Sequence, residues 1–169
     1  MKMWQMRTTK VEFFILTIMS LIGLASSLTV IYEFSVLGQL PPLCTFQGNP
    51  TFLGAHVNCA IVLSSTYSTF HGISLEAMAA VWFIINLALI TTMIFASRGV
   101  SRKLFNLLFA WRFLGLAIVP YLVYLEFFVV HAICTYCTIM HAAIIIDFAI
   151  ITYLVFSENS KIKRDLFDR

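Results

Sequence analysis

Four long apolar runs constrain the fold of this chain more than any other feature of its sequence. They cover about residues 11–37, 75–96, 104–130 and 132–156. Each run exceeds the roughly 18 to 20 residues that a helix needs to cross the hydrocarbon core of a bilayer. Charged residues make up only 11% of the chain, whereas they supply about a quarter of a soluble domain. The sequence therefore predicts an all-α, integral membrane four-helix bundle.

Nearly everything outside these runs lies in one segment, residues 38–74. The other links are too short to hold a separate module, so we expect residues 1–169 to form a single membrane domain. The segment has turn chemistry in Pro41-Pro42 and Gly48-Asn49-Pro50. It carries no Lys, Arg, Asp or Glu but many apolar residues. Such a segment is expected to lie against the helix ends as a lid.

The basic residues predict the orientation in the membrane. The first run extends well past the length of a signal-peptide core, so it is read as a retained helix. Basic residues gather before the first run, in the link after the second run, and in the tail: Lys2, Arg7, Lys10, Arg98, Arg102, Lys103, Lys161, Lys163, Arg164 and Arg169. The positive-inside rule then puts both termini in the cytoplasm and residues 38–74 outside. The net charge of +3 is thus a topology signal and gives no support for nucleic-acid binding.

Four cysteines form two pairs on the predicted external side. Cys44 and Cys59 lie in the external segment, and Cys134 and Cys137 form a CxxC motif near the start of the fourth helix. Residues three apart on a helix share a face. A thiolate near a helix N-terminus is favoured by the free amide groups there. This arrangement indicates reversible disulfide exchange.

Other uses of the same residues remain possible. Two structural disulfides would suit an oxidising compartment. Four thiolates could bind zinc, although Cys44 and Cys59 are fifteen residues apart and lack the close pairing of a zinc knuckle. His131 and His141 could ligate haem, but at ten residues apart they are nearly three turns separated and cannot share one iron. We favour the redox relay and expect no resident metal.

A family resemblance becomes visible in the external segment. Residues 57–68, VNCAIVLSSTYS, are followed by Gly72-Ile73 and resemble the loop signature of the vitamin K epoxide reductase family. The CxxC motif also stands on the last helix, where that family has it. The disulfide-bond B type of bacterial thiol oxidase has its CxxC in the first external loop instead. The resemblance covers about residues 44–141.

The resemblance implies a role for each cysteine. Cys44 would be the outer loop cysteine, which exchanges with a partner thiol, and Cys59 the inner one. Cys134 would receive electrons through a transient disulfide with Cys59. Cys137 would react with the quinone ring.

The resemblance also implies a quinone pocket and a function. Ser65, six residues after Cys59, matches a family serine and would line the pocket. His141 stands where the animal reductases carry a tyrosine, which favours quinone reduction over epoxide reduction. The quinone would be of the ubiquinone, menaquinone or vitamin K type.

We therefore expect a quinone-dependent thiol oxidoreductase that oxidises a thioredoxin-like partner in support of disulfide-bond formation, in a prokaryotic plasma membrane. Reduction of vitamin K epoxide or quinone is the second hypothesis. A non-catalytic four-span scaffold with a disulfide-tied loop is the rival from another class.

The remaining charges in the apolar runs have structural interpretations. Arg112 and Asp147 both lie about 12 to 14 Å from the cytoplasmic boundary at ~1.5 Å per residue, and an unpaired charge at that depth is costly. We therefore predict an ion pair between the third and fourth helices. Glu33, Glu76 and Glu126 lie near the external helix ends, where they are expected to reach water.

Overall fold

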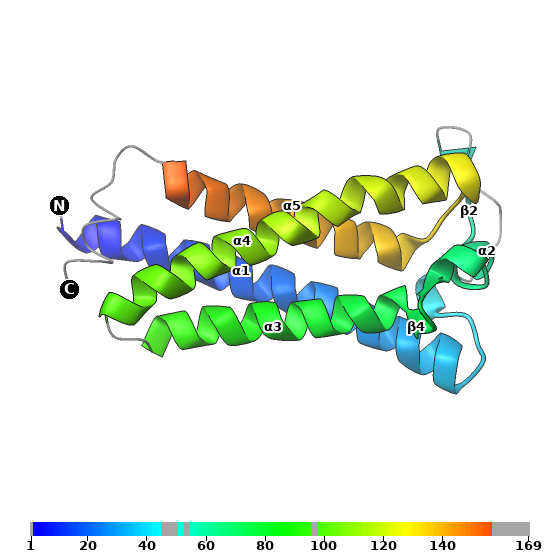
Figure 1. The fold of residues 1–169 in the computed structure, drawn as a ribbon, viewed down its shortest axis with the longest axis horizontal. Helices are drawn as coiled ribbons and strands as arrows, with labels where there is room; N and C mark the ends of the chain where they lie inside the picture. The colour runs from blue at the N-terminus through cyan, green and yellow to red at the C-terminus, as the bar shows by residue number, and fades with distance from the viewer. Residues whose placement is uncertain (1, 45–50, 53–54, 96–97, 157–169) are drawn as a thin grey trace.

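The computed structural model describes residues 2–44, 51–52, 55–95 and 98–156. Four long helices run along its length: α1 (Lys2–Val30), α3 (Leu75–Phe95), α4 (Arg98–Tyr124) and α5 (Thr135–Phe156). Each, with the turn that continues it in α1 and α4, provides a stretch that is long and apolar enough to cross a membrane: Val11–Val36, Leu75–Met93, Asn106–Val129 and Thr135–Tyr153. The predicted four-helix membrane bundle is confirmed. The start of α1 and the end of α5 lie at one end of the molecule, and the segment between α1 and α3 covers the opposite end (Figure 1).

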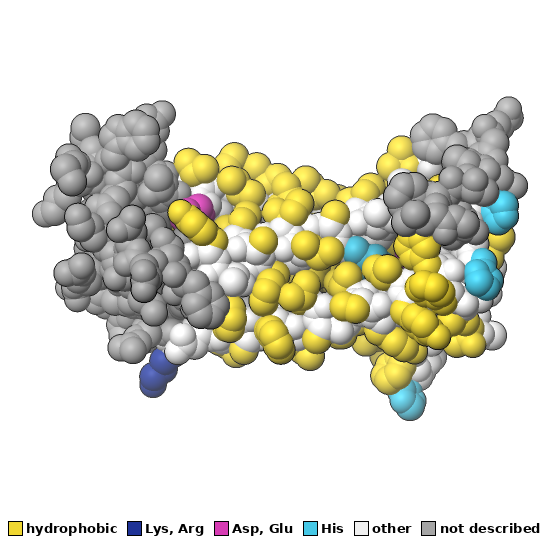
Figure 2. Space-filling view, turned by 90° about the horizontal axis from the view of Figure 1, so that it is seen from above, with side chains coloured by type: hydrophobic (Ala, Val, Ile, Leu, Met, Phe, Trp, Pro, Cys, Tyr) yellow, Lys and Arg dark blue, Asp and Glu magenta, His cyan; other side chains and the backbone are white. Residues whose placement is uncertain are grey.

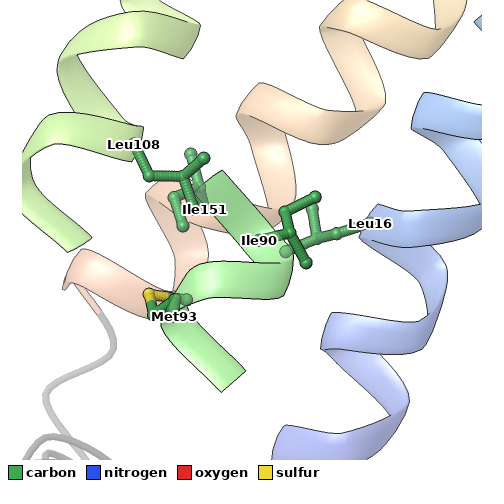
Figure 3. Packing of buried hydrophobic residues seen from close by; sticks show 5 residues of the cluster. All are labelled: Leu16, Ile90, Met93, Leu108 and Ile151. Atoms are coloured by element: carbon green, nitrogen blue, oxygen red, sulfur yellow. The ribbon is translucent and has the colours of Figure 1, made fainter. Parts of the chain in front are cut away.

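The bundle has a defined order of neighbours. Helix α1 packs along α3 and α5, and α4 packs on the same two helices. At the end away from the loop, the core takes side chains from all four helices: Leu16, Ile90, Met93, Leu108 and Ile151 (Figure 3). The outer surface is also apolar, and hydrophobic side chains cover the middle of the face seen in Figure 2. This is expected for a bundle whose solvent is lipid.

Two glycines allow close packing between helices. A Cβ atom on Gly23 would overlap the ring of Phe83, which is fully buried. A Cβ atom on Gly115 would lie 2.6 Å from the indole of Trp82. Helices in a membrane gain little from hydrophobic contact with one another, so close approach at small residues contributes much of their packing energy. These glycines let α3 fit against α1 and α4.

The predicted ion pair is confirmed in the middle of the bundle. The Arg112 guanidinium lies 3.7 Å from the Asp147 carboxylate, and both side chains are fully buried. Asn86 links them, because its amide donates to Asp147 at 3.0 Å and its carbonyl accepts from Arg112 at 3.1 Å. Ser20 donates to Asp147 at 3.1 Å. The network therefore ties all four helices together, whereas the sequence predicted a link between two.

Two wide helical turns mark the end near the loop. Helix α1 continues as the π-helix η1 (Ile31–Val36), and α4 continues as the π-helix η4 (Leu125–Val129). Pro120 stands inside α4, where it removes one hydrogen bond of the helix. In η4 the amide of Val130 donates to the carbonyl of Leu125 at 2.8 Å. π-turns of this kind often occur at functional sites.

The segment between α1 and α3 contains short elements rather than one extended loop. They are η2 (Pro42–Cys44), β1 (Thr51–Phe52), β2 (Ala55–Val57), α2 (Cys59–Leu63), η3 (Thr66–Ser68), β3 (Thr69–Phe70) and β4 (Ile73–Ser74). Strands β3 and β4 pair with each other and lead into α3. Strand β2 pairs with β1 on one side and on the other with β5 (Ala132–Ile133), which precedes α5. The fourth helix therefore begins at Thr135, later than the predicted residue 132, because this pairing holds residues 132–133 extended.

Candidate functional site

Backbone pairing places Cys59 of the loop beside Cys134, the residue just before α5. Strands β2 and β5 run parallel, with Val57 opposite Ile133. The pairing continues one residue further, where the amide of Asn58 donates to the carbonyl of Ile133 at 3.0 Å. The residues that follow Asn58 and Ile133 are Cys59 and Cys134. The register of this small sheet therefore brings the two cysteines together.

Asn58 also starts the helix that carries Cys59. Its side-chain oxygen accepts from the amides of Ala60 at 3.0 Å and Ile61 at 3.4 Å, as an N-cap residue does. Cys59 is the first residue of α2 and is buried. It forms a disulfide with Cys44 of η2, with the Cα atoms 5.6 Å apart. The loop pair is thus oxidised, while Cys134 and Cys137 are free thiols.

The sulfur of Cys134 lies against the loop disulfide. The sulfur atoms of Cys44, Cys59 and Cys134 all lie within 4.8 Å of one another. Disulfide exchange begins when a thiolate attacks a disulfide sulfur. At this distance the Cys134 sulfur needs to move only a short way to bond with a sulfur of the loop. Two of the three sulfurs are bonded to each other, so the group offers one free thiol and not the set of thiolates that a metal ion requires. The arrangement is suited to exchange.

The surroundings of Cys134 favour its thiolate. The side chain of Cys137 forms a hydrogen bond with Cys134 that lowers the pKa of the Cys134 thiol below its ordinary value. The amides of Cys137 and Tyr136, at the start of α5, act in the same direction, whereas burial and the nearby Glu126 oppose it. A thiolate is the reactive form in exchange. These surroundings therefore favour exchange at Cys134, the CxxC sulfur that lies beside the loop disulfide.

A cavity of about 90 Å³ lies on the other side of Cys137. Its walls come from α3, from the end of α4 with η4, and from α5, and its cover comes from α2 and η3. Figure 1 shows α4 diverging from α3 toward this end of the molecule. Ser65, Cys137 and His141 all line the cavity. The structure therefore brings together the residues that the sequence linked to a quinone pocket.

The hydroxyl group of Ser65 already has a hydrogen-bond partner within the protein. The hydroxyl of Ser65 donates to the carbonyl of Val62 at 2.8 Å. His141 is buried. It lies one helical turn after Cys137 on α5, as predicted.

Two acidic side chains were missed as members of this site. Glu76 and Glu126 line the same cavity and are only 8% and 6% exposed. The expectation that they reach water is therefore wrong. The thiol of Cys137 lies within hydrogen-bonding reach of the Glu126 carboxyl group. The sequence did contain a signal for Glu126, because an ionisable residue within a membrane span is a candidate functional residue by default.

Comparison with known proteins agrees with the geometry. Residues 14–152 match the model of the vitamin K epoxide reductase family. The matched range contains the four cysteines and the whole lining of the cavity. No curated protein matches this chain.

Proposed function

This chain belongs to the vitamin K epoxide reductase family of membrane oxidoreductases, and from this membership we propose that it oxidises the thiols of a partner protein and passes the electrons to a membrane quinone. The observation that carries the proposal is the cluster of three sulfur atoms within 4.8 Å, formed by the loop disulfide and Cys134. A structural disulfide would have no need of a free, reactive thiol beside it. The cluster is what an internal relay requires.

The relay would transfer two electrons at each step. A dithiol of the partner reduces the Cys44–Cys59 disulfide and is itself oxidised to a disulfide. The loop dithiol then reduces a Cys134–Cys137 disulfide through a mixed disulfide between Cys59 and Cys134. Finally the two thiols of the CxxC motif lose two electrons and two protons, which the quinone takes up to become quinol.

The cavity beside Cys137 is the proposed quinone site. It lies within the apolar bundle and is lined mostly by apolar side chains, as expected for a lipid-soluble ring. Ser65 and His141 would border the ring, with His141 as a hydrogen-bond or proton donor to a quinone oxygen. The ring supplies an acceptor for two electrons. Ubiquinone, menaquinone or a vitamin K type quinone would meet these requirements.

The proposed partner is a thioredoxin-like protein on the external side of a prokaryotic plasma membrane. The basic residues of the link after α3 support a cytoplasmic position for that end. Because the described ends of α1 and α5 lie at that same end (Figure 1), the cysteines would then face outside. Cys44, which is less buried than Cys59, would be the cysteine that meets the partner.

The test is quinone-dependent oxidation of an added dithiol by the purified protein in lipid nanodiscs. A reduced thioredoxin-like protein and a short-chain ubiquinone or menaquinone serve as substrates, and the loss of quinone absorbance gives the rate. We expect turnover that is abolished in Cys59→Ala and Cys137→Ala. Thr91→Ser, an exposed position on α3, is the matched control. A wild-type protein without quinone-dependent turnover would point to the scaffold instead.

A further inference from the structure

The carboxyl group of Glu126 lies beside the thiol of Cys137. Two groups lie within hydrogen-bonding reach of the single proton of the Cys137 thiol: this carboxyl group and the sulfur of Cys134. Glu126 is buried and belongs to the lining of the cavity that also contains Cys137. Among the described residues that line the cavity there is no lysine or arginine. An ion pair with one of these lining residues therefore does not account for the buried acid.

The fold of the third membrane helix brings Glu126 to this position. Leu125 and Glu126 are consecutive and both buried, although neighbouring residues on a helix point in different directions. They occupy the start of the π-helix η4, whose wider turn follows Pro120 in α4. The irregular turn allows both side chains to face the bundle. It also sets the acid of η4 opposite the CxxC motif of α5.

We infer that Glu126 is the catalytic base that accepts the proton of the Cys137 thiol when the CxxC pair is oxidised. This inference rests on the proposed function, because it concerns the reduction of quinone at the same site. A thiol is a weak electron donor until it loses its proton. A base within hydrogen-bonding reach can supply that step in an apolar cavity, where solvent hydroxide is scarce.

The step balances in atoms and electrons. The S–H bond of Cys137 breaks, and its proton forms an O–H bond on Glu126. The Cys134 and Cys137 sulfurs then join in a disulfide, and the two electrons that they give up reduce the quinone. Glu126 returns its proton to a quinone oxygen, so the carboxylate is restored. The second proton, which Cys134 releases on becoming a thiolate, goes to the other quinone oxygen.

Other titratable groups line the same cavity or act on Cys137 directly. They are Glu76 on α3, His141 on α5, Tyr67 on η3 and Cys134 itself. Of the two acids, Glu126 is the one whose carboxyl group lies within hydrogen-bonding reach of the thiol. Glu76 is oriented by its own neighbours, since Ser74 and its own backbone amide form hydrogen bonds with it. Glu126 is therefore assigned the proton of Cys137.

The test uses Glu126→Gln, Glu126→Asp and Glu126→Ala in the nanodisc assay. We expect Glu126→Gln to lower kcat by at least about a hundredfold, the lower end of what a positioned base supplies, with KM for quinone within about twofold of wild type. Its rate should rise about tenfold per pH unit below the range in which a free thiol ionises, since hydroxide must then remove the proton. Glu126→Asp should recover part of the rate, and added formate should accelerate Glu126→Ala. Glu33→Gln, at the same end of the bundle but outside the cavity lining, is the matched control.

The outcomes separate the inference from the proposed function. If wild type reduces quinone and Glu126→Gln does so equally fast with the same pH profile as Glu33→Gln, the role of Glu126 is wrong and the relay stands. If wild type itself shows no quinone reduction, the proposed function fails. Loss of rate in Glu126→Gln without rescue by Glu126→Asp or formate, and without a changed pH profile, would indicate a structural effect and would also overturn the inference. Exchange between a reduced partner and Cys44–Cys59, measured without quinone, should remain intact in all three variants.

Discussion

The sulfur of Cys134 lies within 4.8 Å of the sulfur of Cys59, although the two residues belong to opposite halves of the chain. The parallel pairing of Val57 with Ile133 just before them sets this distance. Electron transfer between the two pairs would therefore need a shift of a few ångströms and no large movement of the lid.

The first prediction concerns the order of exchange. Cys137→Ala leaves Cys134 without its partner, so Cys134 should attack the loop disulfide and remain bonded to Cys59. We expect the Cys59–Cys134 linkage to be the main mixed disulfide when the protein is quenched with acid and alkylated, as measured by peptide mass spectrometry. Cys137→Ala combined with Cys134→Ala is the control and should keep Cys44 bonded to Cys59. A predominant Cys44–Cys134 linkage would reverse the proposed roles of the two loop cysteines.

The second prediction concerns the pH dependence of Cys134. Its pKa is lowered chiefly by the hydrogen bond with Cys137, so its thiolate should persist to lower pH than that of a free thiol. In a Cys44→Ser/Cys59→Ser background, reaction with methyl methanethiosulfonate should reach half its maximal rate at lower pH in Cys137→Ser than in Cys137→Ala. The serine hydroxyl can still donate a hydrogen bond, whereas alanine cannot. Equal midpoints in the two variants would contradict this account.

The third prediction concerns the buried ion pair. Arg112→Leu leaves the Asp147 carboxylate buried with only Asn86 and Ser20 as partners, and the free energy of unfolding should fall by about 3 to 5 kcal/mol. The charge-swapped variant Arg112→Asp/Asp147→Arg should be more stable than either single change. Thermal unfolding in detergent measures both effects. Lys103→Met, at an exposed position, should change stability by less than about 0.5 kcal/mol, and a swapped variant no better than the singles would count against pairing.

The fourth prediction concerns the contact between α1 and α3. Gly23→Ala would push a methyl group into the buried ring of Phe83, at a cost of about 1 to 3 kcal/mol. Combining it with Phe83→Leu should recover part of that loss, because the smaller side chain makes room. Ala25→Leu, which is exposed on the same helix, is the control and should have little effect. If Gly23→Ala and Ala25→Leu were equally stable, the helices would not approach at this point.

The fifth prediction concerns membrane orientation. After reduction of intact cells with an impermeant phosphine, an impermeant maleimide should label Cys44. A cysteine introduced by Ser101→Cys, in the helix end near the basic link, should react only after the cells are permeabilised. Labelling of the introduced cysteine in intact cells, with Cys44 protected, would show the opposite orientation.

The main features of the fold could be predicted from the sequence because the bilayer requires long apolar runs. Four such runs indicated four helices. Arg112 and Asp147 were predicted to pair because an unpaired charge deep in the membrane is costly. The roles of Asn86 and Ser20 in that network could not be foreseen, since an amide and a hydroxyl fit a membrane helix without a charged partner. Likewise, a helix start at residue 132 fits the hydropathy, and only the pairing of β2 with β5 reveals the strand there.

The site was predictable in part. The spacing of Cys134 and Cys137 and the family signature around Cys59 pointed to the four cysteines, whose assigned roles stay predictions. The position of Glu126 was misjudged because a charged residue near a helix end was expected to reach water. The π-turn after Pro120 rotates this side chain inward, and a local change of helix type leaves little trace in hydropathy.

The loop is fastened to the segment just before the fourth helix by main-chain hydrogen bonds from His56 and Asn58 to His131 and Ile133, at 3.1 and 3.0 Å. Main-chain groups are the same for nearly every amino acid, so this attachment does not depend on the side chains displayed around it. The outward surface of the lid can therefore change to suit a different partner protein, while the sulfurs of Cys59 and Cys134 stay side by side. A graft of another lid that preserves this short ladder and both loop cysteines should still deliver electrons to the CxxC motif.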